Sequence, residues 1–194
     1  MDVIVKKIAT KDYLTKSNLP ASDYVINPYV GCPHACKYCY ASFMKRFTGH
    51  DEKWGTFIDI KECDKPIDIN KLKGKSVFIA SVTDCYNPFE ERYEITRKIL
   101  EQLVGADCEV TISTKSSLIL RDLDLLKKFP DLKVAFSINT LNEAFRKDMD
   151  YWSGLAEEMD SYCKKMGIKF ENYFYHEKLV KEKYSKRMIK PCVD

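Results

Sequence analysis

The stretch KSVFIASVTDCYNPFEERYEITRKILEQLVGADCEVTIST, residues 75–114, has an apolar run at each end and an amphipathic segment between them. It opens with a continuous apolar run at 75–81 and closes with a second run at 108–114, as is typical of strands buried on both faces. The residues between them, 87–105, predict a helix with acidic side chains in its first turn and one apolar face. A strand, a helix and a strand in this order predict a parallel βαβ unit with a right-handed crossover.

The same alternation continues on both sides of this unit. Residues 117–130 predict a helix that ends at a proline, and 132–138 predict a third buried strand. Before the unit, 24–26 predict a short strand, and the apolar residues within 52–62 suggest an edge strand. The sequence therefore predicts the α/β class, with about four strands of a partial (β/α) barrel or an open sheet.

Polar side chains follow each of the predicted strands where it ends. These ends are a cysteine-rich loop after 24–26 and the segments 81–84, 113–116 and 137–140. In parallel α/β folds the chemistry gathers at the carboxyl ends of the strands. Because all four ends would face the same side, the sequence predicts an active site there.

The cysteine loop is NPYVGCPHACKYCYA, residues 27–41, with Cys32, Cys36 and Cys39 in a C-x3-C-x2-C pattern. A zinc site would need a fourth ligand, and His34 inside the loop is expected on the solvent side instead. A redox pair would use Cys36 and Cys39 but leave Cys32 without a role. An iron–sulfur cluster held by three thiolates would leave one iron open.

Length and composition indicate the class of protein. The chain has 194 residues, 45% hydrophobic and 31% charged, with a formal net charge of +3, which is ordinary for a globular protein. The first residues lack a signal-peptide pattern and no apolar run is long enough to span a membrane, so a cytoplasmic location without membrane contact is expected. The five cysteines outside the loop are expected to be packing residues.

The pattern changes after residue 150. We therefore divide the chain into a core at 1–150 and a C-terminal helix with a basic, aromatic tail at 151–194. Such a tail could stack on single-stranded bases, with a solvated surface segment as the alternative. Four strands cannot close a six-stranded partial barrel, so the chain is expected to be truncated or to lack an internal segment after about residue 150.

The cysteine loop, together with SVTDCYNPFEERYEITRKILEQL, TISTKSSLILRDLDLLKK and VAFSINT, resembles the radical S-adenosylmethionine (radical SAM) superfamily. Over about residues 12–150 it is similar to the spore photoproduct lyase-like branch, and within that branch to paired radical SAM proteins of bacterial mobile elements. The resemblance implies a [4Fe–4S] cluster on the three cysteines and SAM on the open iron. It implies reductive cleavage to a 5′-deoxyadenosyl radical, in a lyase or oxidoreductase type of reaction on an unknown substrate.

The resemblance also implies cofactor-binding residues at the strand ends. Tyr40 would lie near the adenosine, Thr83 would contact the methionine amino group, and Lys115 and Ser137 would take the carboxylate. Asn139 is a further candidate. Each has a simpler alternative: packing for Tyr40, bonds to local backbone for Thr83 and Ser137, solvation for Lys115 and helix capping for Asn139.

The resemblance leaves the substrate and partners open. In spore photoproduct lyase a cysteine serves as hydrogen donor where this chain has Ser81, which argues against repair of DNA photoproducts. The implied partners are SAM and a reductant such as flavodoxin or ferredoxin, with nucleic acid or a partner radical SAM protein as further candidates. The alternative function is a non-catalytic iron–sulfur or zinc-binding module.

Overall fold

The computed structural model describes residues 3–19, 22–36, 39–137, 161, 164–165 and the backbone of 169–171. Its strands are β1 (Ile4–Ala9), β2 (Leu14–Lys16), β3 (Tyr24–Ile26), β4 (Tyr29–Val30), β5 (Phe57–Glu62), β6 (Lys75–Ile79), β7 (Cys108–Thr114), β8 (Leu132–Phe136) and β9 (Lys169–Glu171). Its α-helices are α1 (Glu90–Tyr93), α2 (Ile95–Leu103) and α3 (Leu123–Leu126), and its 3₁₀ helices are η1 (Tyr40–Phe47), η2 (Ile69–Leu72) and η3 (Ser117–Asp122).

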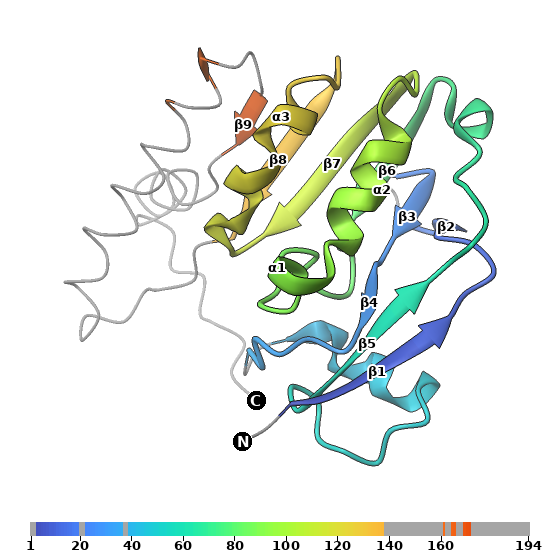
Figure 1. The fold of residues 1–194 in the computed structure, drawn as a ribbon, viewed down its shortest axis with the longest axis vertical. Coiled ribbons are helices and arrows are strands. Elements are labelled where there is room, and N and C mark those ends of the chain that lie inside the picture. Colours follow the sequence, from blue (N-terminus) through green and yellow to red (C-terminus); the bar gives the residue numbers. More distant parts are fainter. Residues whose placement is uncertain are drawn as a thin grey trace, which may run out of the picture.

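The larger sheet has the order β2-β3-β6-β7-β8-β9 (Figure 1). Its centre consists of the four predicted strands, β3, β6, β7 and β8, which are parallel neighbours in that order. Val77 pairs with Val110 and Ile112 with Val134, so the apolar runs lie side by side and these residues share one buried face. The residues between them are half-buried or exposed, so the expectation that these strands are buried on both faces is wrong for this sheet. The predicted α/β class with a partial parallel sheet is confirmed.

The two edges of this sheet come from segments that the sequence did not identify as strands. β2 pairs antiparallel with β3 at one edge. β9, from the segment assigned to the C-terminal tail, pairs parallel with β8 at the other edge. The remainder of that tail, its predicted helix and the junction near residue 150 lie largely outside the described residues.

The smaller sheet corrects the expectation for 52–62. β5 is not an edge strand, because it lies between β1, which is parallel to it, and β4, which is antiparallel. Phe57, Ile58 and Ile60 are fully buried, which requires cover on both faces of this strand. β1 and β4 are the two edge strands of this sheet, and the mixed polar sequence of β1 gave no strand pattern.

The predicted single helix over 87–105 is two helices. Glu94 has φ +53°, a left-handed conformation that ends α1 and starts α2 in a new direction. This break points the first amides of α2 at the side chain of Glu90, whose carboxylate accepts from the backbone N–H of Thr96 at 2.9 Å. The predicted helix over 117–130 is likewise short, formed by η3 and α3.

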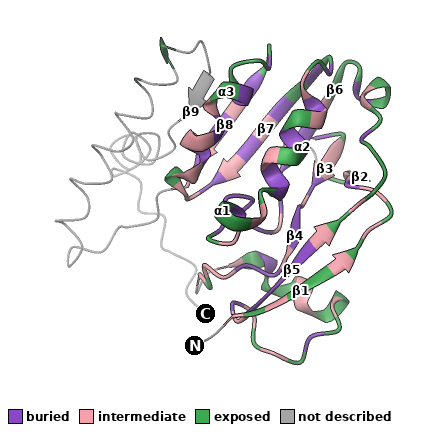
Figure 2. Ribbon diagram, in the orientation of Figure 1, coloured by how far each residue is buried: buried purple, intermediate pink, exposed green. Residues whose placement is uncertain are grey.

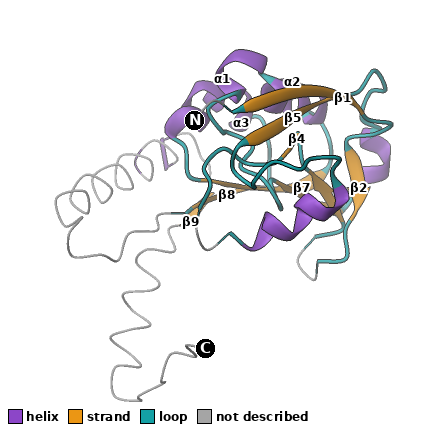
Figure 3. Cartoon of the chain, turned by 90° about the horizontal axis from the view of Figure 1, so that it is seen from below, coloured by secondary structure: helices purple, strands orange, loops and turns teal. Residues whose placement is uncertain are grey.

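The helices α1 to α3 lie on one side of the larger sheet (Figure 3). Apolar residues of α2 and α3, among them Leu100 and Leu126, join one buried cluster with Val110 and Ile112 of β7. Figure 2 shows that burial is concentrated in the central strands and on the inner sides of the helices. No helix within the described ranges is long and apolar enough to cross a membrane.

Candidate active site

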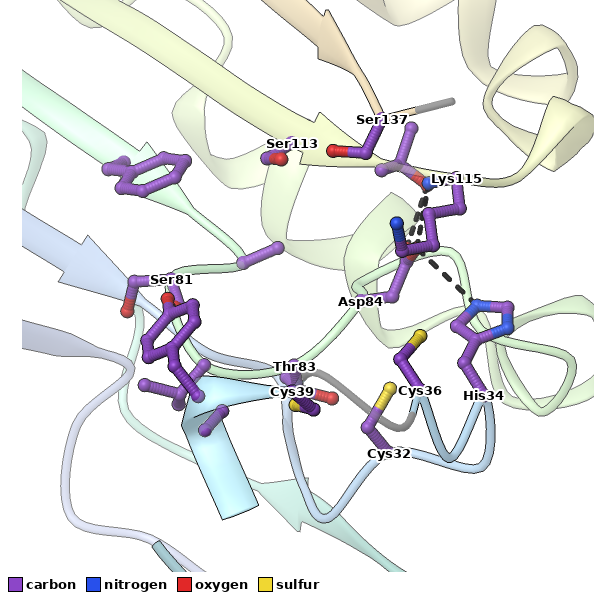
Figure 4. A pocket seen from close by; sticks show the side chains of 16 residues that line it. Cys32, His34, Cys36, Cys39, Ser81, Thr83, Asp84, Ser113, Lys115 and Ser137 are labelled. Carbon is purple, nitrogen blue, oxygen red and sulfur yellow. Dashed lines mark hydrogen bonds and ion pairs between the residues drawn. The ribbon is translucent and has the colours of Figure 1, made fainter. Parts of the chain in front are cut away.

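A pocket of about 250 Å³ opens at the carboxyl ends of the parallel strands (Figure 4). The cysteine loop forms one wall and the ends of β6, β7 and β8 form the other. Its polar and sulfur-bearing lining residues are Cys32, His34, Cys36, Cys39, Tyr40, Ser81, Thr83, Asp84, Ser113, Thr114, Lys115 and Ser137. The predicted convergence of the strand ends is confirmed. Of the candidate residues, only Asn139 lies outside the described part of the chain.

Gly31 sets the entry to the cysteine loop. Its φ is +82°, and a Cβ at this position would lie 2.5 Å from the backbone oxygen of Phe57, so only glycine fits. Its carbonyl accepts a 2.7 Å hydrogen bond from the hydroxyl of Thr83. Thr83 is buried and therefore ties the loop to the end of β6. The hydroxyl of Thr83 donates its proton to the carbonyl of Gly31. The hydroxyl oxygen can still accept a hydrogen bond from an ammonium group, as the predicted contact with SAM requires.

Two tight turns arrange the three thiols. The amide of Ala35 donates to the carbonyl of Cys32 at 3.2 Å, and the amide of Cys39 donates to that of Cys36 at 3.1 Å. All three cysteines are free thiols on the wall of the same pocket. Burial raises the pKa of Cys32, although the amides of Asp84 and His34 favour its thiolate. A bound cation would reverse the effect of burial.

This arrangement fits a cluster better than a single ion. Among the described residues, no group of three or more His, Cys, Asp or Glu side chains is placed to hold one metal ion. A zinc ion needs all its ligands within about 2.3 Å of one point. A [4Fe–4S] cluster is held by cysteine thiolates on different iron atoms, so its ligands can stand farther apart. Three thiols around one open pocket match that requirement.

Tyr40 and Asn27 join the cysteine loop to the segment after β6. The hydroxyl of Tyr40 donates to the carbonyl of Ser81. Asn27, which follows β3, donates to the hydroxyl of Ser81 at 2.9 Å and accepts from the amide of Val82 at 3.0 Å. Burial raises the pKa of Tyr40 even though 70% of the residue's surface is exposed. Its phenol is therefore a neutral group at the edge of the pocket.

Asp84 is the most connected side chain of the site. Its Oδ1 accepts from the hydroxyl of Thr114 at 2.7 Å and from the amide of Tyr86 at 2.9 Å. Its Oδ2 accepts from the amide of Lys115 at 2.8 Å. The Nε2 of His34 lies 3.4 Å from the same oxygen, an ion-pair distance without hydrogen-bond geometry. The expectation that His34 faces solvent is therefore wrong.

The environment of Asp84 keeps it ionised. Burial by itself would raise its pKa, but His34, Thr114 and the amide of Lys115 hold the pKa below its ordinary value. The side chain of Lys115 lines the pocket on the same side. Ser137 lines it from the end of β8, where its amide donates to the carbonyl of Thr114 at 2.8 Å.

A second buried carboxylate, that of Glu90, supports the start of the cysteine loop. Glu90 has no exposed surface and accepts from the hydroxyl of Tyr29, at the start of the cysteine loop. Its Oε1 accepts from Arg121 at 2.7 Å. Arg121 also pairs with fully buried Asp122 at 2.8 Å. The charges of Glu90, Arg121 and Asp122 thus compensate one another within a network that connects β4 to α1 and η3.

Sequence reasoning missed the roles of Asn27, Asp84 and Glu90. Asp84 and Asn27 both follow a strand end directly, a position that could have identified them. Glu90 was expected only as a first-turn acidic residue of a helix, and nothing in its surroundings indicated burial. Cys85 is fully buried and outside the pocket lining, and burial raises its pKa well above the ordinary value, as expected of a packing residue.

Comparison with protein families gives a match over residues 26–174 to the family described as the Radical SAM superfamily. Two similar relatives are uncharacterized proteins. One, MJ0683 of Methanocaldococcus jannaschii, is 40% identical over 153 residues, which cover 78% of this chain and 58% of the relative. The other, ORF301 of Acidianus two-tailed virus, is 36% identical and covers 63% of this chain and 44% of the relative.

Among solved structures, the fold is similar to that of spore photoproduct lyase. A mutant of that enzyme with bound AdoMet and dinucleoside spore photoproduct aligns with a TM-score of 0.50 and 16% identity. The alignment covers 70% of this chain and 40% of that chain. This chain thus spans between two fifths and three fifths of the length of these proteins.

Proposed function

Because this chain belongs to the radical SAM superfamily, we propose that it is a radical SAM enzyme whose active site is the pocket at the strand ends. The cofactors of this family are a [4Fe–4S] cluster and SAM. When bound, they supply a 5′-deoxyadenosyl radical by one-electron reductive cleavage of SAM, and that radical abstracts hydrogen from a substrate. The protein's part is to bind, orient and shield these groups.

The residues of the pocket divide this work between them. Cys32, Cys36 and Cys39 would hold the cluster. Lys115 and Ser137, from adjacent strand ends, would meet the SAM carboxylate, because a cation and a hydroxyl match that anion. Thr83 would accept from the amino group and Tyr40 would border the adenosine. Asn139 stays a prediction.

The observation that carries this proposal is the shared pocket. Three thiols from one loop and polar groups from three later strand ends line the same cavity. A non-catalytic metal module, the alternative function, has no need of a cation and hydroxyls opposite its thiols. A reductant such as flavodoxin or ferredoxin would supply the electron.

The proposal predicts that the chain forms 5′-deoxyadenosine. The protein is reconstituted with iron and sulfide without oxygen, and dithionite and SAM are added. Chromatography is expected to show 5′-deoxyadenosine and methionine in amounts that depend on the loaded cluster. A correctly loaded protein that yields neither product would overturn the proposed reaction and favour the non-catalytic module.

Lys115→Met is expected to weaken SAM binding about tenfold or more, since a charge-assisted bond to a carboxylate is lost. Isothermal titration of SAM into the oxidised, reconstituted protein measures this. Lys127→Met, on the exposed surface after α3, is the matched control and should leave binding unchanged. Equal affinity in the two variants would remove Lys115 from the site.

The substrate is the open part of the proposal. The structural neighbours bind a dinucleoside photoproduct, which makes nucleic acid one candidate. However, the described pocket has no thiols other than the three assigned to the cluster, and Ser81 stands at its edge. A reaction that ends with hydrogen return from a cysteine at that position is therefore disfavoured. A partner radical SAM protein remains a second candidate for interaction.

A further inference from the structure

Asp84 connects the two walls of the pocket. Through its backbone N–H it faces the sulfur of Cys32, one of the three cluster thiols. Through its carboxylate it holds Thr114 and Lys115 at the end of β7, at 2.7 and 2.8 Å. The only loop side chain that faces this carboxylate among the described contacts is His34, between two of the cysteines. Figure 4 shows His34 and Lys115 on either side of Asp84.

The chemistry of this position requires a carboxylate. The side chain of Asp84 is 7% exposed, and its two oxygens together meet three hydrogen-bond donors and one imidazole nitrogen. A carboxylate only accepts, so both of its oxygens suit this set of donors. An amide of the same shape would present N–H to one of these donor groups. A buried donor without an acceptor is costly, so the surrounding segments would shift.

We propose that Asp84 is a positioning residue that sets the Lys115 segment against the cluster loop, and so couples SAM binding to the electrostatics of the cluster. The SAM part of this inference rests on the proposed function. The backbone of Lys115 is held by Asp84, because its amide donates to that carboxylate at 2.8 Å. The electrostatic part follows from a buried negative charge beside a cluster ligand, because such a charge opposes the uptake of an electron.

The first test is Asp84→Asn in the full chain, reconstituted without oxygen. We expect the dissociation constant of SAM to rise about tenfold and the midpoint potential of the cluster to become more positive. Titration calorimetry measures the first, and a redox titration followed by electron paramagnetic resonance measures the second. Asp59→Asn is the matched control, because the side chain of Asp59 is likewise 7% exposed, pairs with His50 at 2.9 Å and lies outside the pocket lining; it should change neither quantity.

A second pair of variants keeps the charge of Asp84 and changes its partner Thr114. Thr114→Val loses the hydroxyl that donates to Asp84 and accepts from the amide of Ser116, whereas Thr114→Ser retains it. We expect Thr114→Val to weaken SAM binding about fivefold with an unchanged potential, and Thr114→Ser to restore it. This pair tests whether the bond between Asp84 and Thr114 supports SAM binding, even if Asp84→Asn does not fold.

Two results would overturn the inference. One is an Asp84→Asn protein with wild-type SAM affinity and potential whose melting temperature alone falls, as in Asp59→Asn. The other is equal SAM affinity in Thr114→Val and Thr114→Ser. Because neither measurement needs turnover, a wild-type chain that binds SAM without forming 5′-deoxyadenosine would overturn the proposed reaction and leave this inference standing.

Discussion

Cys36→Ala is expected to abolish the iron–sulfur cluster and, with it, the formation of 5′-deoxyadenosine. Cys36 is half-buried on the wall of the pocket, between the two tight turns of the loop. Two thiolates cannot hold a cluster whose three bound irons each need one. The fold should survive, because a half-exposed cysteine contributes little packing, and a change in unfolding free energy within about 0.5 kcal/mol is expected.

The matched control is Cys63→Ala. Cys63 is also half-buried, but its thiol donates a 3.5 Å hydrogen bond to the carbonyl of Lys65 and does not line the pocket. Iron and sulfide content, the visible absorption of the reconstituted protein and product formation are compared in the two variants. A Cys36→Ala protein that keeps its cluster and still makes 5′-deoxyadenosine would refute the ligand assignment.

Glu90→Ala is expected to lower the free energy of unfolding by about 3–5 kcal/mol, the range for loss of one partner of a buried ion pair. The carboxylate has no exposed surface and accepts from Tyr29, from the amides of Thr96 and Arg97, and from Arg121. Its removal leaves these donors without their acceptor. Chemical denaturation followed by circular dichroism measures the loss.

Glu91→Ala is the control for this prediction, since Glu91 is adjacent and exposed. It should change stability by no more than about 0.5 kcal/mol. The network also reaches the start of the cysteine loop through Tyr29. We therefore expect Glu90→Ala, but not Glu91→Ala, to reduce the yield of cluster on reconstitution. Similar stabilities for the two variants would show that the buried network is not what holds this region.

The parallel strands were predictable because their signal is local. Val77, Ile79, Val110 and Ile112 lie in short apolar runs rich in β-branched residues, and such runs favour strands. β1 was not predictable in the same way, because an edge strand with exposed lysines has no such pattern. It pairs Ile4 with Phe57 and Val5 with Ile58, and that pairing depends on a segment some fifty residues away.

The break between α1 and α2 has a comparable cause. Residues 95–103 have a helical apolar face, and the preceding residues 90–94 include neither glycine nor proline, so local preference favours one helix. The left-handed conformation of Glu94 is unfavourable for a residue with a side chain. It is stabilised by what it permits, namely the approach of the α2 amides to the buried carboxylate of Glu90. Only the tertiary environment of that carboxylate can outweigh the local preference.

Three features could be read from the sequence alone: the four central parallel strands, the cysteine triplet and the polar residues at the strand ends. Each depends only on neighbouring residues, as an apolar run, a ligand spacing or a strand terminus. The way in which the two walls of the pocket are joined could not be read in this manner. Asn27 to Ser81, Thr83 to Gly31 and Asp84 to His34 are contacts across some fifty residues of chain. Hydrogen bonds and ion pairs of this kind depend on where the folded backbone places both partners, so no local pattern records them.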